Sequence, residues 1–361
     1  MKPQFIAMLI AGLILASGGR LEAQILPGGC SSCGPFAGGG PFAGMSGAFP
    51  GAGPVFPDHG RHGKHGHDDP RNDCFLTLEL DMLMLNRDEP DTVFLASDAV
   101  TTAPLLSTDS LNFDRELGGR ISAIIHRPSG LDFELAFLGA GDWSENRAAI
   151  SGNGLVISAP GGATLNANTA EFRAASRMWS AEFNLHWRLL PRITLLAGLR
   201  RVEFEDSLVS LTSRAIATQL QSDYEIRTRN EVMGVQVGVQ ATLFRLGPGF
   251  SLDARVKGGY YWNDASHFLA DTGGNGAVGA LSATASDNPT IFDIAVRGTF
   301  HLAEHVELWA GFQFLTVGNL ATAPGQIAGN DLFGVGTGAV SVDTNDRIQF
   351  FGAGSGLTIR F

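Results

Sequence analysis

The chain has 361 residues, of which 17% are charged, and its formal net charge is −11. No basic face offsets this acidic balance, so nucleic-acid binding is excluded as a leading function. The only long apolar run lies at the N-terminus, so the sequence predicts no membrane-spanning helix elsewhere. This length suits one large β-domain or two ordinary domains.

The N-terminal run has the features of a secretory signal peptide. Lys2 gives it a positive start, an apolar core follows from Phe5 to Ala16, and small residues precede the expected cleavage after Ala23. Residues 1–23 are therefore expected to be removed during export.

Residues 24–73 are rich in Gly, Pro and Phe and show neither a helical nor a strand period, which predicts a disordered periplasmic tail. The candidate metal ligands in this tail are His59, His62, His65 and His67. Cys30 and Cys33 form a C-x2-C pair, but a zinc site would need a second pair, so adventitious metal binding is the favoured interpretation and no cofactor is expected. Whether Cys30 and Cys33 form a disulfide that leaves Cys74 unpaired stays open.

From Cys74 onward, apolar and polar residues alternate with the period of a β-strand. Ten segments show this alternation. The clearest runs from Met233 to Leu243, with Val residues on one face and Gly and Gln on the other. In the segment that begins at Ile193, the pattern loses register from Arg201 to Phe204, which indicates either a bulge or the membrane rim.

The connections between these segments alternate in length. Tight links are expected at 126–130, 189–192, 245–249 and 301–305, and long polar links at about 87–112, 140–175, 208–222, 263–289 and 318–346. An even strand number with short turns on one side is the architecture of a transmembrane barrel. Residues 74–361 are thus predicted to form an all-β, closed antiparallel barrel of about ten strands, or twelve if the 208–222 link adds a hairpin. The long loops are expected outside the cell and both termini in the periplasm.

Alternation alone does not show which face is inside, because a soluble lipocalin-like barrel would bury the apolar face. Three features favour the membrane arrangement: glycines and opposite charges on the polar face, an unbroken apolar face, and aromatics at the short-turn ends. The lumen is then predicted to be lined by Glu79, Asp81, Arg120, Asp132, Glu134, Glu182, His186, Arg200, Asp253, Arg255, Lys257, Arg297, Glu307 and Arg360.

Ten strands enclose little more than a side-chain-filled interior, whereas porins with aqueous channels use about sixteen. The sequence therefore predicts porin-like, narrow or gated passage of small solutes. The alternative is a structural or surface-binding barrel that acts through its long loops. An enzyme is not expected: Asp264 and His267 share a loop where a barrel hydrolase would keep such a pair, but no nucleophile or further partner matches. The loop acids Asp343 and Asp346 lack the spacing of a calcium site.

The last fifteen residues alternate as a strand and end on an aromatic residue. Gly356, Ile359 and Phe361 resemble the C-terminal assembly signal of bacterial outer-membrane barrels, although Ile359 stands where an aromatic is usual. The chain from about Cys74 also resembles the porin-type outer-membrane barrel family of planctomycetes, in the stretches Ser176–Trp187, Leu196–Phe204, Tyr224–Gln236, Leu308–Ala323 and Phe350–Phe361. These resemblances imply outer-membrane lipid and the barrel assembly machinery as partners, and homo-oligomers stay open.

Overall fold

A computed structural model of the chain describes residues 75–160, 164–213, 223–247, 249–271, 280–328 and 341–361. The predicted signal peptide, the tail with its four histidines, and all three cysteines lie outside these residues. The described residues belong to the unit Asp69–Phe361. No helix among them is long and apolar enough to cross a membrane.

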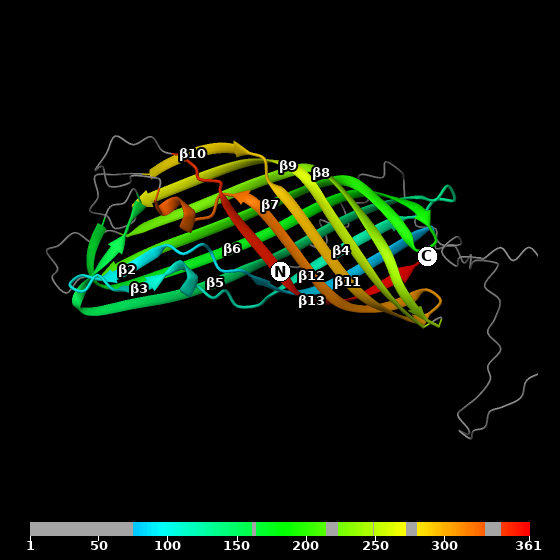
Figure 1. Ribbon diagram of the computed structural model, residues 1–361, viewed down its shortest axis with the longest axis horizontal. Helices are drawn as coiled ribbons and strands as arrows, with labels where there is room; N and C mark the ends of the chain where they lie inside the picture. The colour runs from blue at the N-terminus through cyan, green and yellow to red at the C-terminus, as the bar shows by residue number, and fades with distance from the viewer. Residues whose placement is uncertain (1–74, 161–163, 214–222, 248, 272–279, 329–340) are drawn as a thin grey trace, which may run out of the picture. The chain divides into compact units, whose positions relative to one another are not determined.

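Ten antiparallel strands close into a ring (Figure 1), which confirms the predicted fold and the smaller of the two predicted strand numbers. The pairing order runs from β1 through β4, β5, β6, β7, β8, β9, β11 and β12 to β13, which pairs again with β1. The bounds are β1 (Leu76–Arg87), β4 (Glu116–Ile125), β5 (Leu131–Ser158), β6 (Thr164–Leu190), β7 (Ile193–Ser213), β8 (Tyr224–Leu246), β9 (Phe250–Asp271), β11 (Thr290–Ala303), β12 (Val306–Leu320) and β13 (Asp346–Arg360).

Three shorter strands and two 3-10 turns are added outside the ring order. β2 (Phe94–Asp98) pairs with β3 (Pro104–Ser107) and with β5, while β10 (Ala280–Asp287) pairs with the far half of β9. The turns are η2 (Thr108–Ser110) and η4 (Pro324–Ile327). All of these elements lie toward the long-loop end of the barrel (Figure 1).

The seam of the barrel joins the first strand to the last. Thr77 pairs with Arg360 across this seam, and the backbone N–H of Phe75 donates to the carbonyl of Phe361 at 2.8 Å. Residues Leu76 and Phe361 therefore lie together at the short-turn end. The predicted assembly signal forms one side of the closing strand pair.

The short-turn half of the barrel is apolar outside and polar inside. On β8, Met233, Val235 and Val237 face outward and are exposed, whereas Gln236 between them is buried in the lumen. Exposed aromatics border this apolar belt, with Trp187 and Phe300 toward the short turns and Trp262 at the other margin. Because lipid accepts only such a surface on a closed barrel, the ring is a transmembrane β-barrel.

The polarity of the two faces inverts beyond the belt. On β7 the inward Val202 and Phe204 are fully buried, while the outward Arg201 and Glu203 form ion pairs. Strand pairing of β7 with β6 and β8 continues without a shift through this stretch. The loss of pattern at Arg201–Phe204 therefore marks the membrane rim and not a bulge.

The predicted long loops are partly wrong for this reason. The segment expected as a link at 140–175 is mainly strand, since β5 continues to Ser158 and β6 starts at Thr164. Likewise, β9 and β10 occupy most of the link expected at 263–289. We call this part of β5 to β10 beyond the belt the extension. Its exterior faces water and is polar. Because a membrane barrel is expected to be apolar outside, these strands resemble loops when that expectation is applied to the whole chain.

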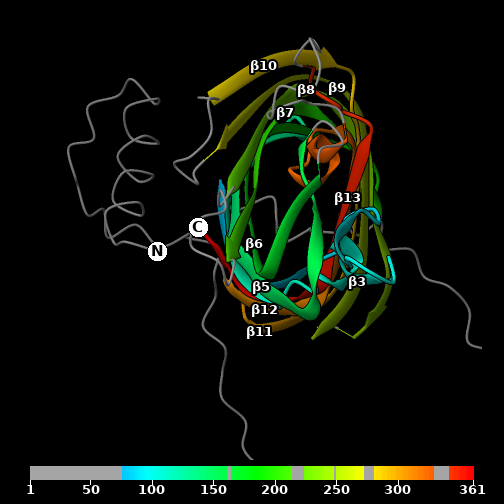
Figure 2. The same cartoon turned by 90° about the vertical axis from the view of Figure 1, so that its left-hand side faces the viewer.

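The interior of the extension is an apolar core. Trp143, Phe172 and Phe204 are fully buried there, and Phe350 packs against Trp143 with ring centroids 5.1 Å apart. Seen along the barrel from the long-loop end, η4 lies inside the ring (Figure 2), and Ile327 joins the same core. The long-loop half of the lumen is therefore filled.

Candidate functional site

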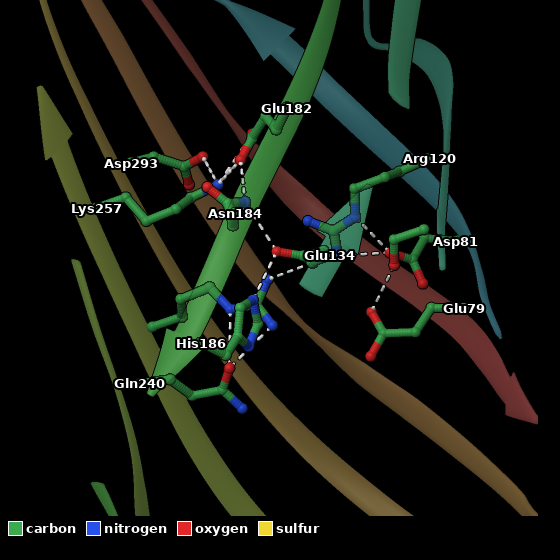
Figure 3. Close-up of polar contacts among 12 residues, drawn as sticks. Glu79, Asp81, Arg120, Glu134, Glu182, Asn184, His186, Gln240, Lys257 and Asp293 are labelled. Carbon is green, nitrogen blue, oxygen red and sulfur yellow. Dashed lines mark hydrogen bonds and ion pairs between the residues drawn. The ribbon is translucent and has the colours of Figure 1, made fainter. Parts of the chain in front are cut away.

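The middle of the lumen contains ion pairs that join distant strands of the ring (Figure 3). Arg297 on β11 lies 3.1 Å from Glu79 and 3.4 Å from Asp81, which both belong to β1. Arg120 on β4 donates to the same Asp81 carboxylate at 2.6 Å. Two strands separate β1 from β11 in the ring, so this group forms a chord across the lumen.

A second group crosses the lumen from β5 and β6 to β9 and β11 (Figure 3). The Nζ of Lys257 lies 2.7 Å from Glu182 and 3.3 Å from Asp293. Arg200 lies 3.1 Å from the same Asp293, and Arg255 lies 3.4 Å from Glu134. These contacts bring side chains of five strands together in one layer.

Neutral polar side chains satisfy the remaining oxygens of this layer. Asn184 donates to Glu134 at 2.8 Å, and Gln236 donates to Glu182 at 2.9 Å. The Nε2 of His186 lies 3.0 Å from Glu134, so this histidine belongs to the hydrogen-bond network. Buried charges persist only when they are paired in this way.

The ion-pair layer is balanced in charge. It contains five carboxylates, from Glu79, Asp81, Glu134, Glu182 and Asp293, against five cations, from Arg120, Arg200, Arg255, Lys257 and Arg297. Five against five leaves no net charge that would attract one kind of ion. Asp293 is a member of the layer that sequence reasoning missed, although its place on the polar face of β11 signalled it.

Trp309 on β12 adds bulk to the layer. Its Nε1 donates to Asp81 at 2.7 Å, and the guanidinium of Arg297 lies 4.3 Å from the centre of its ring. The indole crosses β13 over Gly354 and Gly356, where any Cβ would collide with it. Gly356, predicted as part of the assembly signal, thus also makes room for the Trp309 side chain inside the barrel.

A polar cavity of about 130 Å³ lies between this layer and the short turns. We call it the short-turn vestibule. Asp132 in its wall lies 3.0 Å from His126, Asp253 accepts hydrogen bonds from Thr242 at 2.6 Å and Ser251 at 2.9 Å, and Arg360 lies 2.7 Å from Glu307. The predicted lumen residues that do not belong to the ion-pair layer or its network thus lie here.

On the opposite side of the layer, the connection after β12 enters the lumen. We call residues 320–328, which include η4, the plug. Asn230 on β8 holds its backbone through both the N–H and the carbonyl of Ala321, each at 2.8 Å. Asp206 on β7 accepts from the N–H of Ala323 at 3.0 Å and is itself paired with Arg87 of β1 at 2.9 Å.

Sequence reasoning missed the plug and the residues that hold it. Arg87 stands at the start of the link expected at 87–112, and Asp206 follows the stretch where the pattern on β7 inverts. Both side chains point inward and are buried, as the strand period predicts once the inversion is allowed for. The inward position of both residues therefore follows from the alternation of inward and outward residues along each strand, continued beyond the membrane rim.

The two residues of the suggested hydrolase pair do not meet. Asp264 is exposed on the outer face of β9, where it accepts from Ser286, whereas His267 is buried on the inner face. Burial lowers the pKa of His267 to about 4, and neither ring nitrogen has a hydrogen-bond partner in the structure described. A neutral imidazole without an acidic partner is not arranged as a catalytic base.

No metal site is found among the described residues, where no group of three or more His, Cys, Asp or Glu side chains converges. The loop acid Asp346 is hydrogen-bonded to Thr322, and Asn345 contacts Asp343. The tail histidines lie outside the described residues.

The apolar belt, the polar paired lumen and the closed ring of ten strands define an integral outer-membrane β-barrel. No family model and no curated protein matches the chain. Solved structures to which it is similar include the outer-membrane protease OmpT of Escherichia coli (12% identity, TM-score 0.48, 80% of this chain and 97% of that chain) and the translocator domain of the autotransporter NalP of Neisseria meningitidis (9%, 0.38, 80% and 88%). A third is the toluene transporter TodX of P. putida (9%, 0.31, 80% and 90%). At such identities and TM-scores, none of these similarities bears on what this protein binds or transports.

Proposed function

We propose that this protein is a closed-lumen outer-membrane barrel that acts as a surface-binding barrel through its long-loop end. The observation that carries the proposal is the filled lumen, which an ion-pair layer crosses and an apolar core with a plug completes. The long-loop end of the barrel, in contrast, continues past the membrane as the extension and carries β2, β3 and β10. The long loops then face the cell exterior, and the short turns and both termini face the periplasm.

Single-channel recording tests this proposal directly. The mature protein, refolded and shown to be inserted in planar bilayers, is expected to give no discrete conductance. Discrete ohmic steps from wild-type protein would overturn the closed-lumen proposal. Insertion has to be established on the same sample, for example by protease protection, so that a lack of conductance cannot result from a lack of inserted protein.

Gated, porin-like passage is the second candidate function. Two observations favour it: a polar cavity, the short-turn vestibule, lies on one side of the ion-pair layer, and the plug comes from a connection between strands, which can move without breaking the ring. A variant with residues 321–328 replaced by a short Gly/Ser linker provides the test. Conductance in this variant, with a silent wild type, would identify the plug as a gate. Silence in both would exclude passage.

No catalytic role is proposed. His186 is engaged with Glu134, and the nearest acidic residue to His267 in sequence, Asp264, lies on the other face of the strand. Assembly is proposed to depend on the terminal strand, because Phe361 and β13 form the seam with β1. An exposed strand edge before closure is what an assembly machine can capture by strand addition.

A further inference from the structure

A groove runs across the outer wall of the extension, over β6 to β10. It has a volume of about 700 Å³ and lies on two neighbouring rows of outward side chains. In the row nearer the membrane, Arg177 on β6 is the cross-strand neighbour of Glu205 on β7, which is in turn the cross-strand neighbour of Arg229 on β8. In the next row, Ser207 is the cross-strand neighbour of Arg227. Three arginines thus line the groove from both sides.

These arginines are more exposed than the acids that accompany them. The side chain of Arg177 is 69% exposed against 27% for Glu205, Arg227 is 64% against 19% for Glu225, and Arg229 is 47% against 11% for Glu203. A guanidinium has five N–H donors, more than one carboxylate satisfies. The groove therefore presents guanidinium N–H donors at its surface, next to the less exposed Glu205 and Glu225, which also line it.

Hydroxyl groups complete the wall of the groove toward β10. Ser266 pairs across strands with Thr284, and Ser282 lies in the next row. Arginines combined with hydroxyl donors are the groups that bind phosphate oxygens in proteins. The chemistry of the groove thus fits a phosphorylated group, in a chain whose overall charge is strongly negative.

The groove meets the apolar belt along β6, whereas on β7, β8 and β9 the outward acids Glu203, Glu231 and Asp264 lie between the groove and the belt. On β6, Trp179 lies two residues from Arg177 on the same face and toward the membrane, and on β9 the exposed Trp262 lies four residues from Ser266. Aromatic side chains of this kind mark the level of lipid headgroups. A molecule that occupies the groove and extends along the wall would therefore place its apolar part against the belt.

We propose that this groove binds the phosphate-bearing headgroup of a lipid in the leaflet that borders the long-loop end. The arginines contact the phosphate oxygens, the hydroxyl groups contact the remaining headgroup oxygens, and the acyl chains lie along the apolar belt. This inference rests on the proposed orientation of the barrel only for the name of that leaflet. It does not depend on whether the lumen conducts.

Lipid binding to the purified, folded barrel in detergent tests the proposal. The probes are diphosphorylated lipid A and its monophosphorylated form, with binding measured by native mass spectrometry. The test variant is Arg177→Gln/Arg227→Gln. The control variant, Arg147→Gln/Arg173→Gln, removes two exposed arginines of the extension that are also paired with acids but do not line the groove. Heat-modifiable electrophoretic mobility verifies folding of every variant.

Wild type and control are expected to prefer the diphosphorylated lipid. The test variant is expected to lose at least about tenfold in affinity, because it lacks two charge-assisted contacts. Equal loss in test and control variants would overturn the proposal, as would absence of a preference in the wild type. Binding of inorganic phosphate as tight as that of diphosphorylated lipid A would overturn the assignment to a lipid. Because conductance is measured separately, failure here leaves the closed-lumen proposal untouched.

Discussion

Replacement of Lys257 by Met tests whether the ion-pair layer is a dry, closed part of the lumen. The side chains of Lys257, Glu182 and Asp293 are 6%, 10% and 5% exposed, and the lysine ammonium contacts both carboxylates. Without it, four cations face five carboxylates in the layer. Removal of one partner from a buried ion pair costs about 3–5 kcal/mol, because the remaining charge stays buried without compensation.

Arg173→Met is the matched control. Arg173 on β6 forms an ion pair with Glu171 at 2.7 Å, but these side chains are 58% and 35% exposed on the outer wall. Exposed pairs of this kind contribute about 0–1 kcal/mol, since water solvates both charges after the pair is broken. The structure therefore predicts a difference of roughly 3 kcal/mol between two substitutions of similar chemistry.

Urea-induced unfolding from lipid vesicles, followed by tryptophan fluorescence, measures this difference. The double variant Lys257→Met/Glu182→Gln should regain part of the loss, because Asp293 keeps its contact with Arg200 at 3.1 Å. A loss in Lys257→Met no larger than in Arg173→Met would refute the reasoning. It would mean that water reaches the layer, and the case for a closed lumen would fall with it.

Three further predictions concern the belt, the seam and the extension. Val237→Arg, in the exposed belt, should impair membrane assembly because a charge at the bilayer midplane costs about 2–4 kcal/mol; normal assembly would contradict the assignment of this face. Deletion of Phe361 should lower the yield of inserted barrel, since its carbonyl accepts from Phe75 at the seam; protease protection equal to wild type would remove the assembly-signal argument. Burial lowers the pKa of His267 from 6.5 to about 4, so the unfolded state binds more protons between these values. The urea midpoint of the wild type should therefore fall as pH decreases from about 6.5 to 4, and it should fall less in His267→Leu. The same pH dependence in both proteins would contradict this explanation.

The barrel in the membrane was predictable from the sequence because two solvents act on each strand there. Lipid requires apolar residues on one face and the lumen tolerates polar ones on the other, so Met233 to Leu243 alternates without interruption. The same alternation assigned Glu182 and Lys257 to the lumen. It did not show that they are in contact, because pairing across a ring depends on strand tilt and register, which parity does not encode.

The extension and the plug were not predictable in the same way. Beyond the rim, water replaces lipid outside, so the outward positions become Arg201, Glu203 and Glu205 while Val202 and Phe204 turn inward. If every strand is expected to be apolar outside and polar inside along its whole length, this inversion looks like a loss of the alternating pattern. The plug has no period at all, because Asn230 and Asp206 hold its backbone through hydrogen bonds that no side-chain pattern of residues 320–328 reveals.

The abrupt inversion at Arg201 to Phe204 also fixes the depth of the barrel in the bilayer. A shift along the axis by one residue pair would draw Arg201 and Glu203 toward the hydrocarbon or lift Trp262 away from the headgroups, and a charge on the lipid face costs more the deeper it lies. The span of hydrocarbon that the barrel accepts is therefore set by the protein. In a bilayer of another thickness, the lipid around the barrel has to thin or thicken to meet it, at a modest energetic cost for each ångström of hydrophobic mismatch.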